Sequence, residues 1–174
     1  MATGKKSYSI VRLLAALEAE GIKFMLVGMS AANLQGVLES TIDVDIWIGL
    51  PSRQYMNVIN LCRKLGASIR SQNKVYLNDD TPVDFIYEVT GLPVFEREYP
   101  RATWIPFHGL TIPVLPLDRI CKSKQAAGRD KDKLHVLLIR QVMRLQRAAA
   151  RLPASKRQRR ATKSKASHRT AKSK

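Results

Sequence analysis

The sequence predicts an α+β domain whose small mixed β-sheet is flanked by helices and followed by a C-terminal helix pair and a disordered basic tail. Segments with amphipathic helical spacing alternate with short runs rich in β-branched and aromatic residues. A turn-forming tetrapeptide between two of those runs indicates a hairpin. With 174 residues, 45% of them hydrophobic, the chain can bury a core in one domain. We place this domain at residues 1–150 and the tail at residues 151–174.

Helices and strands alternate in the first fifty residues. Residues 8–20 carry leucine and isoleucine at helical spacing and predict an amphipathic helix. Residues 22–27 form an apolar run that predicts a short strand, and residues 30–36 predict a helix with Ser30 as its N-cap. Residues 40–50, "STIDVDIWIGL", combine β-branched and aromatic residues with two alternating acids and predict a second strand.

The middle of the chain predicts a helix, a hairpin and a loop. Residues 52–66 show amphipathic helical spacing and end at a glycine. Residues 74–78 and 82–89 predict strands, and the "NDDT" between them favours an antiparallel hairpin. Residues 91–101 contain one glycine and two prolines and predict a loop.

The remaining part of the domain predicts extended pieces and then two helices. Residues 103–115 suggest extended pieces around a turn, and Pro106 and Pro113 argue against central strands because proline lacks the N–H that a ladder needs. Residues 117–127 predict a helix that ends before a glycine, and residues 130–149 predict a second helix. The expected apolar face of this second helix consists of Leu134, Leu137, Leu138 and Val142.

The positive charge is concentrated at the C-terminus. Residues 1–140 hold 18 Lys and Arg and all 14 acids, whereas residues 141–174 hold 12 Lys and Arg and no acid, within a net charge of +16. A segment so charged and so poor in apolar residues is predicted to be disordered. It is either a solubilising extension or a segment that binds the phosphates of RNA or DNA. We favour loose nucleic-acid binding, since no aromatic residue follows residue 141 to stack on bases.

The composition favours a cytoplasmic protein. No apolar run approaches the roughly 20 residues of a membrane-spanning helix. The first ten residues carry positive charge without the apolar region of a secretory signal. The two cysteines, Cys62 and Cys121, lack metal-binding spacing, which is typical of reduced thiols in a cytoplasmic setting.

Two aspartates lie two residues apart in the predicted strand at residues 40–50. Side chains at i and i+2 leave a strand on the same face, so Asp43 and Asp45 would repel each other unless a cation lay between them. Carboxylate oxygens suit Mg²⁺, and Asp84 would join the pair if its strand were a neighbour. Two metal ions could then hold the attacking and leaving oxygens of a phosphoryl transfer. The alternative is that these acids are the solvated face of an edge strand or part of a turn.

Further residues could bind phosphate. Gly28 permits a close backbone approach, and Ser30 opens a helix whose free N–H groups suit an anion. Lys124, Arg129 and Lys131 cluster where one predicted helix ends and the next begins, and could neutralise phosphate charge. The alternatives are that Ser30 is only an N-cap and that the three cations are only helix-end charges.

The order of these motifs resembles the polymerase-β-like nucleotidyltransferase superfamily. Its pattern of a Gly-Gly or Gly-x-Ser turn, then Asp-x-Asp, then a lone Asp in a later strand is similar to "GMS", "TIDVD" and "VDF" here. The segment "KSKQAAGRDKDKL" resembles the end of small stand-alone members, including relatives of the toxins in abortive-infection toxin–antitoxin systems. The resemblance covers roughly residues 20–140.

The resemblance implies a metal-dependent transfer of a nucleoside monophosphate from an NTP to a hydroxyl acceptor. Asp43, Asp45 and Asp84 would bind two Mg²⁺ ions, or Mn²⁺ in their place, and Asp84 would help to activate the attacking hydroxyl. Gly28 and Ser30 would hold the nucleotide phosphates. The triphosphate or the acceptor would be steadied by the three cations Lys124, Arg129 and Lys131.

The sequence departs from the family pattern at two positions. Glu39 stands where relatives carry an arginine, which bears on nucleotide binding if its side chain points inward. His135, three residues after Asp132, stands where relatives often carry an acid. Asp132 itself would support Arg129 or the helix pair. We interpret His135 as a helix-surface residue, and Trp47 and Trp104 as core or pocket wall.

Two functional hypotheses follow. The first is an enzyme that transfers an NMP to an RNA 3′ end, a protein hydroxyl or a small molecule, with a role in a toxin–antitoxin or defence system. The second is a catalytically weak module of the same fold that associates with nucleic acid or a partner protein. Magnesium-dependent NTP binding discriminates between the two.

Overall fold

The computed structural model describes residues 9–151, which divide into one compact unit that ends at Ile139 and a second that begins at Arg140. The basic tail predicted for residues 151–174 lies outside the described residues except for Arg151, the last residue of a helix. Among residues 9–151, no helix combines the length and the apolar character needed to cross a bilayer.

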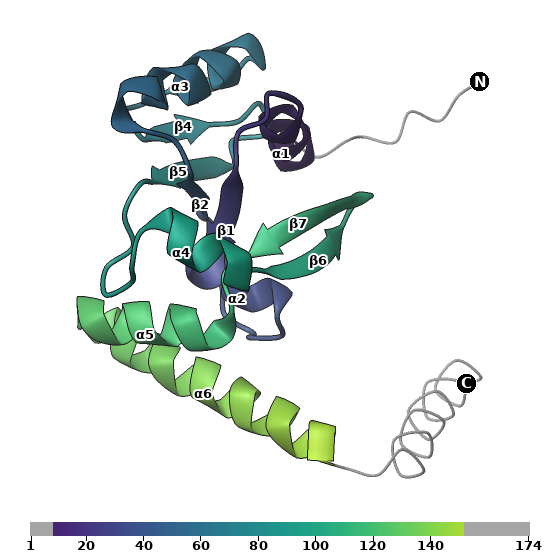
Figure 1. The fold of residues 1–174 in the computed structure, drawn as a ribbon, viewed down its shortest axis with the longest axis vertical. Helices are drawn as coiled ribbons and strands as arrows, with labels where there is room; N and C mark the ends of the chain where they lie inside the picture. The colour runs from purple at the N-terminus through teal and green to yellow at the C-terminus, as the bar shows by residue number, and fades with distance from the viewer. Residues whose placement is uncertain (1–8, 152–174) are drawn as a thin grey trace, which may run out of the picture. The chain divides into compact units, whose positions relative to one another are not determined.

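A seven-stranded mixed sheet forms the centre of the first unit (Figure 1). Its strand order is β3-β4-β5-β2-β1-β7-β6. The central strand β2 pairs antiparallel with β1 and parallel with β5. In chain order the strands are β1 (Phe24–Val27), β2 (Val44–Ile48), β3 (Ser68–Ile69), β4 (Lys74–Tyr76), β5 (Pro82–Ile86), β6 (Thr103–Phe107) and β7 (Leu110–Val114).

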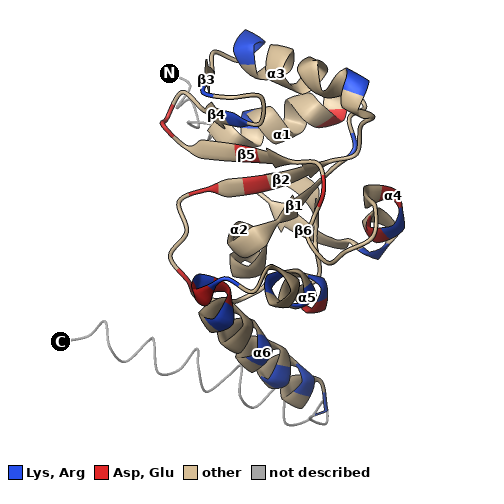
Figure 2. Cartoon of the chain, turned by 90° about the vertical axis from the view of Figure 1, so that its left-hand side faces the viewer, with Lys and Arg blue, Asp and Glu red and all other residues tan. Residues whose placement is uncertain are grey.

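Helices cover both faces of this sheet (Figure 2). Two of them, α1 and α3, lie on one face, and α2 and α5 lie on the other. The predicted α+β class with a mixed sheet is therefore confirmed. The helices are α1 (Ser9–Ala19), α2 (Gly28–Leu34), α3 (Tyr55–Lys64), α4 (Phe95–Glu98), α5 (Leu117–Ala127) and α6 (Asp130–Arg151), with 3₁₀ turns at Ser52–Gln54 and Tyr99–Arg101.

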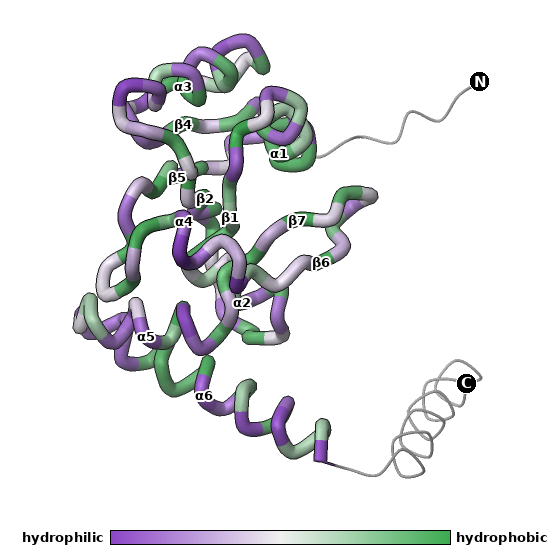
Figure 3. Tube along the Cα trace, viewed as in Figure 1, coloured by the Kyte–Doolittle hydropathy of each residue, from purple (hydrophilic) through white to green (hydrophobic). Residues whose placement is uncertain are grey.

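The core lies where the helices meet the sheet. Helix α1 buries Leu13, Leu14 and Leu17 completely, as its helical spacing predicts. All four residues of β1 are buried, and Figure 3 shows both hydrophobic (green) and hydrophilic (purple) residues along α1 and α3, as expected of amphipathic helices. Strand β2 is less uniform: Ile46, Trp47 and Ile48 are buried, whereas Asp45, near its start, is half-buried. The sheet thus presents polar groups toward α2 and α5.

The structure corrects two expectations, one at residues 91–101 and one at Ser30. Residues 91–101 contain α4 and a 3₁₀ turn rather than only a loop, because Phe95 and Glu98 are buried and fix the segment. A helix of four residues is too short for its period to be visible in the sequence. Ser30 is not an N-cap: α2 begins at Gly28, and the Ser30 hydroxyl donates to the Val27 carbonyl oxygen at 3.3 Å.

Pro113 lies in β7, an interior strand, against expectation. N–H groups two residues apart in a strand point the same way, and the Leu115 N–H donates to the Leu26 carbonyl oxygen of β1. The missing N–H of Pro113 therefore also faces β1, at a point where the β1–β7 ladder consists of the single pair Leu26↔Val114. The proline loses no ladder bond there. Pro106 lies in the edge strand β6, where proline is tolerated.

The inward face of α6 differs from the expected one. Leu134 and Leu137 are 53% and 63% exposed, whereas Val136 and Ile139 are buried and Asp132 is 0% exposed. The rotation of the helix follows from Asp132, because its carboxylate is hydrogen-bonded by Arg129 and must stay beside that partner. A polar contact therefore overrides the apolar stripe that the sequence pattern favours.

Candidate functional site

A cavity of about 380 Å³, which we call the aspartate cavity, lies on the sheet face that is covered by α2 and α5. Seven of the eight site residues predicted from the sequence line it: Gly28, Asp43, Asp45, Asp84, Lys124, Arg129 and Lys131. Ser30 is the exception, since its hydroxyl is turned back to the carbonyl of Val27.

The three aspartates come together through strand register. Asp45 and Asp84 are direct partners in the parallel ladder between β2 and β5. Asp43 precedes Asp45 by two residues and lines the same cavity. Figure 2 shows acidic segments on these two adjacent strands.

Gly28 fits against the Asp45 carboxylate. It has φ +68°, and a Cβ atom at this position would lie 2.1 Å from Asp45 Oδ2. Glycine is the one residue that both accepts this backbone conformation without strain and leaves the space free. Position 28 thus lets the start of α2 rest directly on the carboxylate.

Burial, followed by the charges of Asp84 and Asp43, raises the pKa of Asp45 to about 6. Lys124 and Lys74 act in the opposite direction. The carboxylate is therefore held where its negative charge is poorly solvated and repelled by two neighbours. A cation placed between these groups would relieve the repulsion.

Lys74 supplies one positive charge at this place. It lies opposite Asp84 in the β4–β5 hairpin, and its Nζ is 3.0 Å from Asp84 Oδ2. The hydrogen bond to Asp84 raises the pKa of Lys74. Lys74 is not among the site residues expected from the sequence, although the predicted hairpin brings residues near 74 and 84 opposite each other.

The cations on the other side of the cavity are held by Asp132. Arg129 Nε lies 2.7 Å from Asp132 Oδ2, and Lys124 Nζ lies 3.2 Å from Asp132 Oδ1. Burial alone would raise the pKa of Asp132, but these two partners lower it to about 2. The buried carboxylate thus fixes two cations of α5 and the α5–α6 junction at the cavity.

His135 also lines the cavity, which corrects its interpretation as a helix-surface residue. Its Nδ1 atom is buried, has no hydrogen-bond partner within residues 9–151 and lies 3.8 Å from Asp132 Oδ1. Burial and the charge of Lys124 lower the pKa of His135. His135 lies three residues after Asp132, and residues at this spacing share one face of a helix. An inward-facing Asp132 therefore predicts that His135 also lies beside the site.

Glu39, which stands where relatives carry an arginine, does not line this cavity. Its backbone carbonyl oxygen accepts a hydrogen bond of 2.8 Å from the Asn33 side chain. Its charge nevertheless reaches the cavity wall, where it raises the pKa of His135 against the larger effects of burial and Lys124.

The carboxylates have the chemistry that Mg²⁺ prefers. Within the described part of the chain, no group of three His, Cys, Asp or Glu side chains is arranged to hold a metal by itself. Mg²⁺ usually takes one or two protein carboxylates and completes its shell with water and substrate phosphates. Asp43 and Asp45 therefore fit a Mg²⁺ ion that arrives with a triphosphate.

Solved structures match this architecture, although no family model and no curated protein matches the chain. A lincosamide antibiotic adenylyltransferase with bound lincomycin has a TM-score of 0.56 at 13% identity, over 79% of this chain and 98% of the other. The antibiotic-resistance factor ANT(2″)-Ia has a TM-score of 0.55 at 16% identity, over 92% and 95%. A Thermotoga maritima protein described as a nucleotidyltransferase has a TM-score of 0.56 at 17% identity, over 78% and 92%.

The fold is that of the nucleotidyltransferases. At these identities the likeness establishes the fold, and the acceptors named for those proteins belong to them. In this nucleotidyltransferase fold the strand order brings Asp45 and Asp84 together, although 39 positions separate them in the sequence.

Proposed function

We propose that the protein is a metal-dependent nucleotidyltransferase that moves an NMP from an NTP to a hydroxyl acceptor. The observation that carries this proposal is the pairing of Asp45 with Asp84 across the β2–β5 ladder, with Asp43 and Lys124 in the same cavity. Carboxylates face cations across a space that a triphosphate and its Mg²⁺ would fill. The nucleotidyltransferase fold supports the same class of reaction.

The transfer forms one bond and breaks one. The acceptor hydroxyl oxygen attacks the α-phosphorus of the NTP, the bond from that phosphorus to the bridging oxygen of the β-phosphate breaks, and pyrophosphate leaves. Asp84 lies beside Asp45 and would take the hydroxyl proton. Bound Mg²⁺ would supply charge neutralisation at the phosphate oxygens, with Asp43 and Asp45 as its protein ligands.

The cations would hold the phosphates that leave. Asp132 fixes Lys124 and Arg129 at the cavity, and Lys131 lines it as well. Cations that are already oriented need little rearrangement when negative charge develops on the departing pyrophosphate. Gly28 would let the backbone at the start of α2 approach the phosphates.

The first test is calorimetric binding of the four NTPs with and without Mg²⁺. The double variant Asp43→Asn/Asp45→Asn should lose metal-dependent binding, because it removes both proposed metal ligands. Asp80→Asn is the matched control, since Asp80 is exposed, has φ +60° and tolerates asparagine. NTP transfer that persists in the double variant would refute the assignment.

Three acceptor classes follow from the sequence: an RNA 3′ end, a protein hydroxyl and a small molecule. The basic C-terminal segment supports RNA as a partner. The resemblance to small stand-alone members supports a place in a toxin–antitoxin or defence system.

The second candidate function is a binding module without transfer activity. The ion pair between Lys74 and Asp84 favours it, because a lysine already neutralises one of the three carboxylates. This alternative expects no Mg²⁺-dependent NTP binding by the chain, together with association to nucleic acid or a partner protein.

A further inference from the structure

His135 lines the aspartate cavity but has no part in the transfer as proposed above. Its side chain is 14% exposed, and its buried Nδ1 atom has no hydrogen-bond partner within residues 9–151. A buried polar atom without a partner destabilises the fold, so its presence at a ligand cavity calls for a functional explanation. An imidazole that takes up a proton can donate from both of its nitrogen atoms.

The Asp132 carboxylate lies near the unpartnered nitrogen. Its Oδ1 atom is 3.8 Å from His135 Nδ1, which is longer than a hydrogen bond. A carboxylate can accept about four hydrogen bonds, and Arg129 and Lys124 together donate three to Asp132. A shift of about 1 Å by the imidazole would therefore let Nδ1 donate to a carboxylate that still has room for one more donor.

Charged groups on three elements act on the protonation of His135. Burial and Lys124 of α5 lower its pKa, and Lys131 of α6 acts in the same direction. Asp132 of α6 and Glu39, in the segment between α2 and β2, oppose this effect without cancelling it. The imidazole is therefore neutral near pH 7 in the ligand-free protein.

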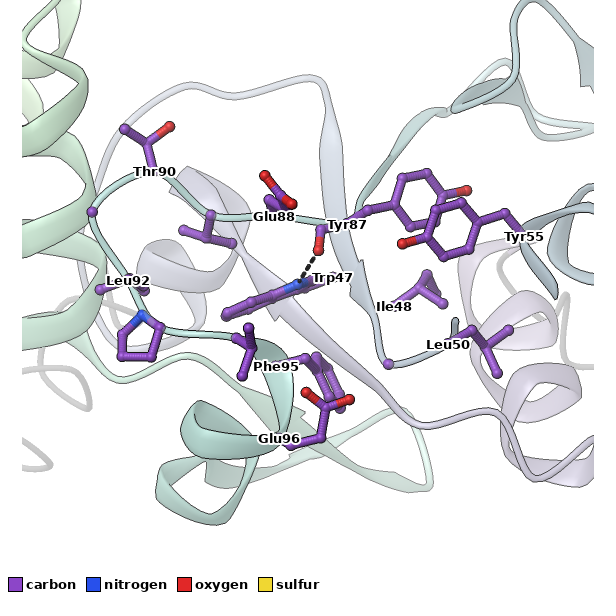
Figure 4. A pocket seen from close by; sticks show the side chains of 15 residues that line it. Trp47, Ile48, Leu50, Tyr55, Tyr87, Glu88, Thr90, Leu92, Phe95 and Glu96 are labelled. Atoms are coloured by element: carbon purple, nitrogen blue, oxygen red, sulfur yellow. Dashed lines mark hydrogen bonds between the residues drawn. The ribbon is translucent and has the colours of Figure 1, made fainter. Parts of the chain in front are cut away.

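The cations of the aspartate cavity would hold phosphates next to this imidazole. Lys124, Arg129 and His135 are gathered around the single carboxylate of Asp132. Glu88, in contrast, belongs to the wall that the aspartate cavity shares with a second cavity, of about 550 Å³, whose lining is drawn in Figure 4. Carboxylates repel phosphates, so a polyphosphate is drawn to the side of His135.

We propose that His135 binds the phosphates of the nucleotide or of pyrophosphate as an imidazolium, with Nδ1 donating to Asp132 and Nε2 donating to a phosphate oxygen. The inference rests on the proposed transferase function for the identity of the ligand. Bound phosphates compensate the charges of Lys124 and Lys131, which removes part of the cause that keeps the imidazole neutral. One proton then passes from solvent to His135 as the ligand binds.

Phosphate binding is thereby coupled to proton uptake. Because the ligand raises the pKa of His135, the added affinity is complete below the ligand-free pKa and is lost as the pH rises through the ligand-bound pKa. One linked proton changes the dissociation constant by at most about tenfold per pH unit. Binding of Mg²⁺ releases protons from Asp45, whose pKa is about 6, and acts in the opposite direction. The contribution of His135 is therefore the difference between the parent and a variant at that position.

NMR titration of the imidazole groups in the full chain, with and without inorganic pyrophosphate and Mg²⁺, tests the proposal. The His135 signal is identified by its absence from His135→Asn. Its pKa should rise by at least about one unit when pyrophosphate binds. His108, an exposed residue of the turn between β6 and β7, serves as the internal control, and its pKa should not move.

Calorimetry of Mg²⁺-pyrophosphate binding at several pH values gives the second readout. His135→Asn keeps an amide donor toward Asp132 but cannot take up a proton. It should bind pyrophosphate about tenfold more weakly than the parent at the acidic end of the range and about equally at the alkaline end. His108→Asn is the same substitution outside the cavity, at φ +48°, a conformation that asparagine tolerates, and it should bind as the parent does. A purely structural role of His135 would leave the pH dependence unchanged.

The outcomes separate this inference from the proposed function. A raised His135 pKa, together with a pH dependence that only His135→Asn loses, supports the inference even if no NMP transfer is found and the transferase proposal fails. NMP transfer with an unchanged His135 pKa overturns the inference and leaves the transferase proposal intact. Two other results also overturn it: a parent that does not bind pyrophosphate, and a His135→Asn variant that keeps the pH dependence of the parent.

Discussion

At the scale of single residues, the dominant feature is the crowding of carboxylates around Asp45. Burial and two neighbouring acids raise its pKa from 3.8 to about 6. A carboxyl group whose pKa is higher in the folded chain than in the unfolded chain weakens folding above the folded pKa. That penalty fades as the pH falls from about 6 through 3.8, because both states then carry the proton.

Asp45→Asn should therefore stabilise the metal-free protein at neutral pH. We expect a gain of about 1–2 kcal/mol in the free energy of unfolding, after allowing for the partial exposure of the group. The gain should shrink toward zero near pH 4, below the folded pKa. Urea unfolding of the variant and the parent at several pH values measures it. A gain that does not change with pH would contradict the electrostatic cause.

Most residues of the candidate site could be predicted from the sequence, but Lys74 and His135 could not. Asp43, Asp45 and Asp84 could be named because acids are rare in apolar strands, and the strand order then brought them together. Lys74 and His135 escaped because their roles depend on hairpin register and on the rotation of α6, neither of which local periodicity determines.

At the scale of elements, the contact between α2 and β2 controls the shape of the aspartate cavity. Helix α2 starts at Gly28, at φ +68°, and this glycine lies against Asp45. Gly21 has nearly the same backbone conformation, φ +67°, but nothing lies within 4 Å of its missing Cβ. Substitution of Gly21 therefore tests backbone strain alone, whereas substitution of Gly28 tests backbone strain together with a steric clash.

Gly21→Ala should destabilise the protein by about 1–2 kcal/mol, the usual cost of a left-handed backbone for an L-residue. Gly28→Ala should cost about 1–3 kcal/mol more, because its methyl group must displace the Asp45 carboxylate. Only Gly28→Ala should also weaken NTP binding. Urea unfolding and calorimetry measure both effects, and equal destabilisation by the two variants would show that the clash relaxes freely.

The elements themselves were predicted where local signals are strong. The turn residues between β4 and β5 and the glycine after α5 gave the hairpin and the helix end correctly. The short β3 and α4 have too few residues for a period. Strand β3 is held by its pairing with the neighbouring β4, and α4 is held by the contacts of Phe95 with Trp47 and of Glu98 with Arg119. The inward face of α6 was predicted wrongly because buried Asp132, a polar residue, sets it.

At the scale of the whole molecule, acidic and basic side chains are concentrated in different parts of the chain. Glu88 and Glu96 are the charged residues that line the 550 Å³ cavity beside Trp47 and Tyr87, whereas the basic character of the sequence accumulates after residue 141. Removing residues 153–174 takes away nine of the 30 Lys and Arg. The two regions should therefore select partners of opposite charge.

The full chain should bind single-stranded RNA with an affinity that falls steeply with salt, since each neutralised phosphate releases a counterion. Deletion of residues 153–174 should abolish most of this binding and leave Mg²⁺-dependent NTP binding unchanged. Fluorescence anisotropy with a labelled oligonucleotide at several salt concentrations provides the measurement. Undiminished RNA affinity in the truncated chain would assign the contact to the folded domain.

The ion pair between Lys74 and Asp84 joins the aspartate cavity to the edge of the sheet. Lys74 belongs to β4, which with β3 forms one end of the strand order. A cation that binds Asp84 must compete with the ammonium group of Lys74 and release it. Cation binding in the aspartate cavity is then coupled to the opening of β4, the strand that carries Lys74. Amide hydrogen exchange along β4 would then report from a distance whether a cation is bound at the clustered carboxylates.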